Sequence, residues 1–307
     1  MNKAFFTLPI ASLFLMGPAS ANQLDLSQVA DDANWVMHMD FDASRSSKIG
    51  SFILDKIEGN EEAVERIEKM KTTFGVDMKG FSSLTMFGNG EHKKGIAILT
   101  GGLNVKKLID FAELNESLQT SRVGRHEIHS FNKDKRHPMA FAALKGNVIV
   151  GGPDADFVSR GINLVKGKAA SREPIGLLGE LRQIIAKPGF IAYLDVAKAA
   201  KFHDLKEGEA AMVEKIDSAG VVAGETDGEL KMAAILKTAD EETAKQVEDM
   251  VRGMLAMAAL SKESDPRLAK ILESQSVKRD GNSVNVQIGL SIDAIKEGIE
   301  REMDKNI

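Results

Sequence analysis

The chain has 307 residues, no cysteine, and 40 basic against 45 acidic side chains, which gives a net charge of −5. Without cysteine there are no disulfides and no thiolate chemistry, so stability must come from apolar cores. Charges of both signs are interspersed, which argues against nucleic acid or an anionic membrane surface as a partner. With one Trp and one Tyr, an aromatic-walled cleft for sugars or drug-like ligands is also disfavoured.

The first 21 residues have the layout of a secretory signal peptide. Lys3 gives a positive start, Ala4 to Met16 is mostly apolar, and Ala19-Ser20-Ala21 is a small-residue cleavage site. The apolar run is too short to span a bilayer, and no other stretch of the sequence reaches the length of a membrane span. We therefore expect an exported protein without a transmembrane segment after signal cleavage.

After a polar lead-in, residues 35–42 read as an opening strand with alternating faces. We expect the apolar face to point into the core; it comprises Trp35, Met37, Met39 and Phe41. The opposite face carries Val36, His38, Asp40 and Asp42.

The rest of the first half alternates helical spacing with hairpin signals. We predict helices over 43–57, 61–74, 104–114 and 154–165. We predict strands over 81–87 and 95–100, a hairpin within 118–131, and strands over 139–144 and 148–150.

The second half repeats this order. Residues 167–174 read as a linker and 175–186 as a helix, and residues 190–197 then repeat the opening strand 155 positions later, with Asp195 matching Asp40. The further predicted elements are a helical stretch over 197–216, a hairpin within 219–237, a helix over 240–260, strands over 276–279 and 283–290, and a helix over 291–303.

Each half therefore reads β-α-β-β-α-β, which predicts an α+β protein of two related ferredoxin-like (split βαβ) modules, with antiparallel sheets and helices on one face. The expected division is a signal peptide at 1–21, a first module at 22–170 and a second at 171–307, in which 171–188 form the linker and a helix. Whether the two sheets join is left open.

One polar cluster suggests a metal site. His38, Asp40 and Asp42 share a strand face and could supply three ligands to zinc or a similar ion. The second half has Tyr193 and Ala197 where the first has His38 and Asp42, so this triplet is not part of the repeated frame. The stronger interpretation is that Asp40, like Asp195, caps the helix that follows.

Two other motifs fail on spacing. His126-Glu127-Ile128-His129 places its histidines three apart in a predicted strand, where the rings face opposite ways, whereas the zincin signature needs them four apart on a helix. Residues 161–169 end in Gly167-Lys168-Ala169, which is one residue too long for a phosphate loop and lacks its hydroxyl. No Gly-x-Ser-x-Gly elbow exists.

Several stretches carry a resemblance. They are the Trp-x-x-His-x-Asp opening, the Ser46-Ser47-x-Ile-Gly run, the paired hairpins and the Val-Gly-Gly-Pro-Asp turn at 150–154. Together they resemble uncharacterised secreted bacterial proteins built of tandem α+β modules. The resemblance implies an envelope location and a duplicated fold, and it brings no activity to any residue.

These observations favour an exported, non-enzymatic binding or scaffold protein of the cell envelope. Its expected partner is a protein or another envelope component, and no cofactor is expected. The alternative is a metal-dependent or carboxylate-based hydrolase that uses the polar face of the strand at 36–42.

Overall fold

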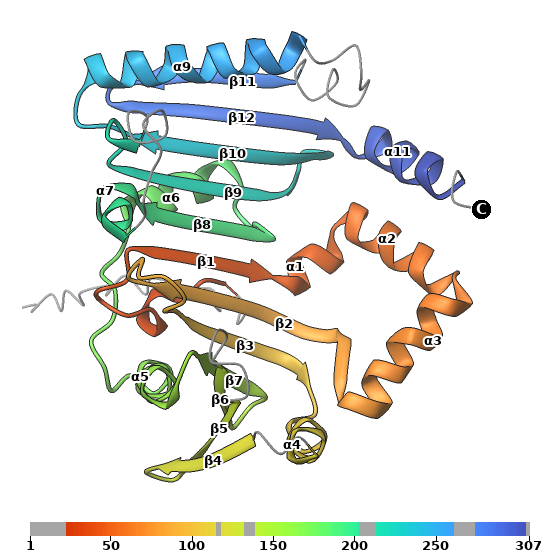
Figure 1. Ribbon diagram of the computed structural model, residues 1–307. Helices are drawn as coiled ribbons and strands as arrows, with labels where there is room; N and C mark the ends of the chain where they lie inside the picture. The colour runs from red at the N-terminus through yellow and green to blue at the C-terminus, as the bar shows by residue number, and fades with distance from the viewer. Residues whose placement is uncertain (1–22, 115–117, 132–138, 203–212, 261–273, 305–307) are drawn as a thin grey trace, which may run out of the picture.

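The computed structural model describes residues 23–114, 118–131, 139–202, 213–260 and 274–304. The predicted signal peptide at 1–21 lies outside these ranges. The described strands form one twelve-stranded antiparallel sheet in the order β11-β12-β10-β9-β8-β1-β2-β3-β7-β6-β5-β4 (Figure 1). The strands are β1 (Trp35–Asp40), β2 (Val76–Gly88), β3 (Ile96–Leu103), β4 (Leu118–Val123), β5 (His126–Phe131), β6 (Met139–Leu144), β7 (Val148–Gly152), β8 (Phe190–Asp195), β9 (Ser218–Thr226), β10 (Glu229–Lys237), β11 (Gln275–Asp280) and β12 (Ser283–Ser291).

Helices lie at one end of the sheet and on both of its faces. The α-helices are α1 (Phe41–Ser46), α2 (Lys48–Glu58), α3 (Glu61–Lys69), α4 (Val105–Glu113), α5 (Ala155–Val165), α6 (Gly176–Ile184), α7 (Val196–Ala199), α9 (Glu241–Leu260) and α11 (Ile292–Asp304). Three shorter turns of helix are η1 (Leu26–Gln28), η2 (Met70–Phe74) and η3 (Ala200–Phe202).

The two opening strands meet at the centre of the sheet. β1 and β8 pair antiparallel, and Met37 lies opposite Ala192, its partner in the 155-residue repeat. Trp35 lies opposite Leu194 and Met39 opposite Phe190. Because Phe190 corresponds to Trp35 in the repeat and Leu194 to Met39, exchanging the two strands leaves the pairing unchanged. The strand order β1-β2-β3-β7-β6 on one side matches β8-β9-β10-β12-β11 on the other. We call this pair of strands the seam; it makes one sheet out of the two halves.

The α+β class with an antiparallel sheet is confirmed, whereas the ferredoxin-like arrangement is not. A split βαβ unit returns through a helix to form a parallel strand pair. In this protein every described pair is antiparallel, and β1, β2 and β3 are neighbours in chain order. The reason is that α1, α2 and α3 extend beyond the end of the sheet, so that the chain turns back beside β1 (Figure 1). Because one sheet runs through both halves, the division at residues 170 and 171 stays a prediction.

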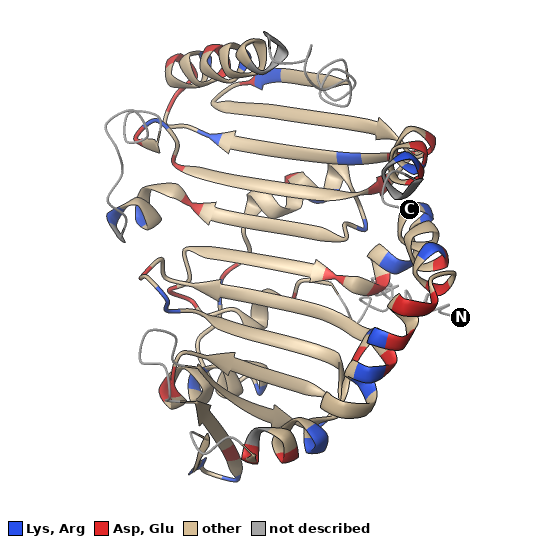
Figure 2. Cartoon of the chain, turned by 45° about the vertical axis from the view of Figure 1, so that its right-hand side comes forward, with Lys and Arg blue, Asp and Glu red and all other residues tan. Residues whose placement is uncertain are grey.

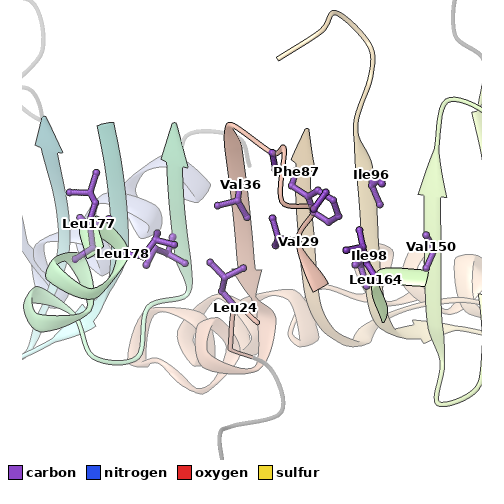
Figure 3. Packing of buried hydrophobic residues seen from close by; sticks show 14 of the residues in the cluster. Leu24, Val29, Val36, Phe87, Ile96, Ile98, Val150, Leu164, Leu177 and Leu178 are labelled. Atoms are coloured by element: carbon purple, nitrogen blue, oxygen red, sulfur yellow. The ribbon is translucent and has the colours of Figure 1, made fainter. Parts of the chain in front are cut away.

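The main core lies on one face of this sheet, which we call the core face. Val36, Phe87 and Ile98 from the strands pack there with Val158 of α5 and Leu181 of α6. Figure 3 shows how side chains of this cluster line up from strand to strand along the sheet. Gly161 of α5 permits a close approach, because a Cβ atom there would lie 2.4 Å from Cγ1 of Val150. This packing accounts for the glycine that opens the rejected phosphate-loop pattern.

Helices also pack on the opposite face, which we call the open face, so the prediction that helices cover one face is wrong. Ala244 and Val247 of α9 form a second cluster with Val277 and Val284. Leu236 packs against this second cluster while its neighbour Ile235 belongs to the main core. Since successive strand residues point to opposite faces, α9 lies on the face away from α5 and α6.

The predicted orientation of the first strand is also wrong. Val36, His38 and Asp40 are buried at 1%, 3% and 7% exposure, whereas Trp35, Met37 and Met39 are only partly buried. The strand ends at Asp40, and Phe41 already begins α1. Hydrophobicity alone misassigns the faces because His38 and Asp40 find hydrogen-bond partners inside the core, which removes most of the cost of burying them.

Candidate functional site

The middle of the open face is apolar, and no described helix covers it. α9 packs on β11 and β12, and α4 packs on η2, so neither helix covers the seam. In Figure 1 no helix lies in front of β8, β1 and β2, and Figure 2 shows that these middle strands carry few charged residues. The alternation of the strands places partly exposed apolar side chains on this face: Trp35, Met37, Met39, Met86, Leu194 and Met232. Leu194 is 36% and Met232 49% exposed.

Trp35 is held at one end of this face by two glycines. It lies directly opposite Gly88 in the pairing of β1 with β2. A Cβ atom on Gly88 would lie 3.0 Å from Nε1 of Trp35, and one on Gly95 would lie 3.3 Å from the ring. The missing side chains let the indole rest against the neighbouring backbone, with its other side toward the open face.

A cavity of about 610 Å³ adjoins the other end of this face. Its floor is formed by strand residues that include Met39, Phe190 and Leu230, and its wall by Ile49 and Ile53 of α2. The lining is mainly apolar, and within the described ranges its ionisable residues are Lys187 and Glu225. We call it the α2 cavity.

The wall of the α2 cavity depends on the joint between α1 and α2. Ser47 caps α2 by accepting from the amide of Gly50 at 2.9 Å. A Cβ atom on Gly50 would lie 1.9 Å from the carbonyl oxygen of Ser44, so a larger residue requires the joint to open. Glu225 of β9 accepts from the amide of Ile49 at 3.2 Å and thereby ties the start of α2 to the sheet.

A second apolar cavity, of about 410 Å³, lies between α4 and the open face of the first half. Leu84 and Leu99 come from the sheet, and Leu108 and Phe111 from α4. Phe111 stays 47% exposed although it packs edge-on against Phe74, with ring centroids 4.7 Å apart. α9, which follows the corresponding hairpin of the second half, instead buries Ala244 and Val247 completely.

The three candidate metal ligands do not come together. His38 is buried, and its Nδ1 lies 2.9 Å from Oγ1 of Thr85. Asp42 lies in α1, outside the strand, and pairs with Arg45. Among the described residues, no group of three His, Asp or Glu side chains is placed to hold a metal ion.

The polar face of β1 also offers no room for a substrate. His38 and Asp40 line a cavity of about 10 Å³ together with Arg182 and Lys187. A space of that size is at the lower limit for a single water molecule. The hydrolase alternative requires this face to be open to substrate, and the geometry gives it no support.

Asp40 and Asp195 are helix caps, as the sequence predicts. Oδ1 of Asp40 accepts from the amide of Ala43 at 2.8 Å, and Oδ1 of Asp195 from that of Lys198 at 3.0 Å. Each carboxylate satisfies an amide that has no partner within its helix. In both helices the donor amide lies three residues after the aspartate, so the cap belongs to the repeated frame.

We expect Asp40→Ala to lower the free energy of unfolding by about 1 kcal/mol, because the first amides of α1 lose their acceptor. Asp40→Asn keeps a side-chain oxygen and serves as the matched control. Urea unfolding followed by the fluorescence of Trp35 measures the difference. Equal losses for the alanine and asparagine variants would show that the charge of Asp40, and not its cap, stabilises the fold.

The two histidines of the rejected zincin pattern lie in β5 and point to opposite faces, as predicted. His129 is buried, and its Nδ1 lies 3.2 Å from Oγ1 of Thr120. His126 lies beside Lys166 at a cavity under the β4–β5 turn. Arg125, Lys133, Lys135, Arg136 and His137 together predict a solvated basic loop beside this strand, and residues 132–138 of it lie outside the described residues.

Comparison with known proteins gives a fold and no family. No family model matches the sequence, and no curated protein matches it. Among solved structures, crystal form III of TP0453 matches with a TM-score of 0.50 and 10% identity, over 90% of this chain and 98% of that chain. Crystal form I of the same protein gives a TM-score of 0.49 at 9% identity, over 90% and 97%. The chain therefore shares a mixed α+β fold with TP0453.

None of the helices in the described ranges is both long and apolar enough to cross a membrane.

Proposed function

We propose that this protein is an exported, non-enzymatic binding protein of the cell envelope, and that the open face with the α2 cavity binds an apolar ligand. Export rests on the basic start, apolar run and small-residue site of residues 1–21. The observation that carries the binding proposal is the apolar surface left uncovered over the seam. Contiguous exposed apolar surface of this kind marks an interaction site in a protein that remains soluble.

The side chains of the open face suit an adaptable apolar contact. Met37, Met39, Met86 and Met232 are unbranched and polarisable, and methionine is the residue that repacks most readily around different partners. The α2 cavity extends this surface into a space with depth. Its charged residues, Lys187 and Glu225, are few, which is typical of a site that orients an apolar ligand by one or two polar contacts.

The hydroxyls of the α2 cavity argue for binding without catalysis. Ser44, Ser46 and Ser47 line it. Their hydroxyls donate to the backbone carbonyls of Asp40, Ala43 and Ser44 at 2.8, 3.1 and 2.8 Å, respectively. Among the described residues that line the cavity there is no histidine. A serine nucleophile needs a hydrogen bond to a general base, and these hydroxyls donate to backbone carbonyls and not to Lys187 or Glu225.

The single tryptophan is a built-in reporter for this proposal. Titration of the chain from Asn22 onward with an apolar fluorophore such as 1-anilinonaphthalene-8-sulfonate should give a saturable change in Trp35 emission, because the probe excludes water from the open face. Met39→Asp places a charge between Trp35 and the α2 cavity and should weaken binding by about tenfold or more.

Met257→Asp is the matched control, because Met257 lies on α9 and is 71% exposed. It should bind the probe as the wild type does. A wild-type protein without a saturable signal, or a Met39→Asp variant with unchanged affinity, would contradict the proposal.

A further inference from the structure

A basic cavity of about 490 Å³ lies between the β4–β5 turn and α5, apart from the open face. Four of its residues carry or can carry positive charge, and two more offer neutral hydrogen-bonding groups. The charged or titratable residues are Arg125, His126, Lys166 and Lys168, and the neutral polar ones are Ser159 and Asn163.

The local fold fixes these groups in place. Ser159, Asn163 and Lys166 follow one another at helical spacing and so share one face of α5 and its cap. The helix ends in a Schellman motif. In this motif the backbone amide of Lys168 donates to the backbone carbonyl of Asn163 at 2.8 Å, and Gly167 adopts a φ of +63°. This motif turns the chain so that Lys168 returns to the cavity.

The positive charges in this cavity have no carboxylate partner among the described residues. In the part of the chain that the structure describes, Arg125, Lys166 and Lys168 form no ion pair, and no Asp or Glu lines the cavity. Arg160, also on α5, is by contrast paired with Asp32 at 2.6 Å. Glu127, which follows His126, is engaged by Arg122 at 2.7 Å.

The cavity's cations disfavour one another. Burial lowers the pKa of Lys166 from its ordinary value, and Arg125 and Lys168 lower it further. Burial likewise lowers the pKa of His126, with added repulsion from Lys166, Arg125 and Lys168. Nζ of Lys166 is in direct contact with Nε2 of His126. The electrostatic repulsion within this cluster costs free energy, and a bound anion would offset it.

The end of α5 accounts for only part of this cluster. A helix C-terminus carries a partial negative charge of about one half and so favours a nearby cation. Three cations exceed that charge, and Arg125 reaches the cavity from the β4–β5 turn, outside the helix. A ligand with more than one negative charge balances the remainder.

We propose that this cavity binds a phosphate group. Arg125 and the two lysines supply charged donors, and Ser159 and Asn163 supply neutral ones, which together match an anion with several acceptor oxygens. The phosphate can be free, part of a small ester, or the headgroup of a lipid. The site is separate from the open face, so it stands or falls independently of the function proposed above.

Calorimetric titration at low ionic strength with inorganic phosphate, with glycerol 3-phosphate, and with phosphatidylcholine vesicles that contain or lack phosphatidic acid tests the site and separates the three sources. We expect saturable binding of at least one phosphate source. Lys166→Ala and Arg125→Ala should each weaken it by about tenfold. Lys166→Arg keeps the charge and should retain most of the binding.

Lys245→Ala is the matched control, because Lys245 is exposed on α9 and lies outside the cavity. The proposal is overturned if none of the phosphate sources binds saturably, or if Lys245→Ala weakens binding as much as Lys166→Ala does. Loss of binding in the two cavity variants with normal circular dichroism supports it.

Proton NMR of the His126 ring gives a second readout. A bound anion favours protonated His126, so phosphate should raise the pKa of this ring toward or above its ordinary value. A His126 pKa that phosphate leaves unchanged or lowers contradicts the proposal.

Discussion

Replacing Ala192 by proline should unfold the protein or destabilise it by at least about 3 kcal/mol. Ala192 lies in the middle of β8, which pairs with β1 on one side and β9 on the other. Proline removes the amide hydrogen that the sheet requires and imposes its own backbone angle, and it is tolerated in sheets only at edges and bulges. The amide of Ala192 faces β9, because Gly189 and Asp195, each an odd number of residues away, exchange hydrogen bonds across the seam. The loss therefore falls on the pairing of β8 with β9, and the proline ring also strains the strand that forms the seam.

The control for this variant is Ala192→Ser, which keeps the amide hydrogen and adds a small polar group on the open face. It should change the free energy of unfolding by no more than about 0.5 kcal/mol. Urea unfolding followed by far-ultraviolet circular dichroism compares the two. A proline variant as stable as the serine variant would show that regular pairing of β8 is not needed to hold the sheet together.

Leu181→Ala should lower the free energy of unfolding by about 2–5 kcal/mol. Leu181 is completely buried in the core between α6 and the sheet. Its Cδ1 atom would lie 2.7 Å from a Cβ atom on Gly220, so the helix already sits as close to β9 as the glycine permits. The alanine variant loses burial and leaves a cavity that the surrounding strands cannot close.

Leu114→Ala makes the same chemical change at a side chain that is 81% exposed. Its expected effect is within about 0.5 kcal/mol. Chemical unfolding of both variants measures the contrast. If the two leucines gave equal losses, the packing of α6 on the sheet would not contribute to the main core.

Local sequence signals predicted the parts of the fold that depend on local chemistry. The caps at Asp40 and Asp195 follow from a carboxylate placed just before a helix, and the strands predicted over 276–279 and 283–290 pair as β11 and β12. The pairing of the two opening strands does not follow from such signals. It joins residues about 155 positions apart, and the repeat indicates only that the two strands are alike.

The candidate site was missed because the sequence assigned its residues to the core. Trp35, Met37 and Met39 look like an inward face by hydrophobicity alone. Which face is covered depends on where α5, α6 and α9 pack, and single-sequence periodicity does not contain that information. The residues around His126 predict a solvated basic loop, whereas the proximity of His126 to Lys166 depends on how β5 packs against α5.

The seam also has a kinetic consequence. Within each half, most neighbouring strands are close in sequence and can zip together through short loops, whereas β1 and β8 must find each other across a long stretch of chain. Closing that distance costs the most chain entropy, so the two halves of the sheet are expected to form before they join. Until then each half of the sheet presents an unpaired strand edge that fits the edge of the other half. At high protein concentration a second molecule can offer the same edge. Exchange of halves between two copies is therefore the expected misfolding route of this architecture.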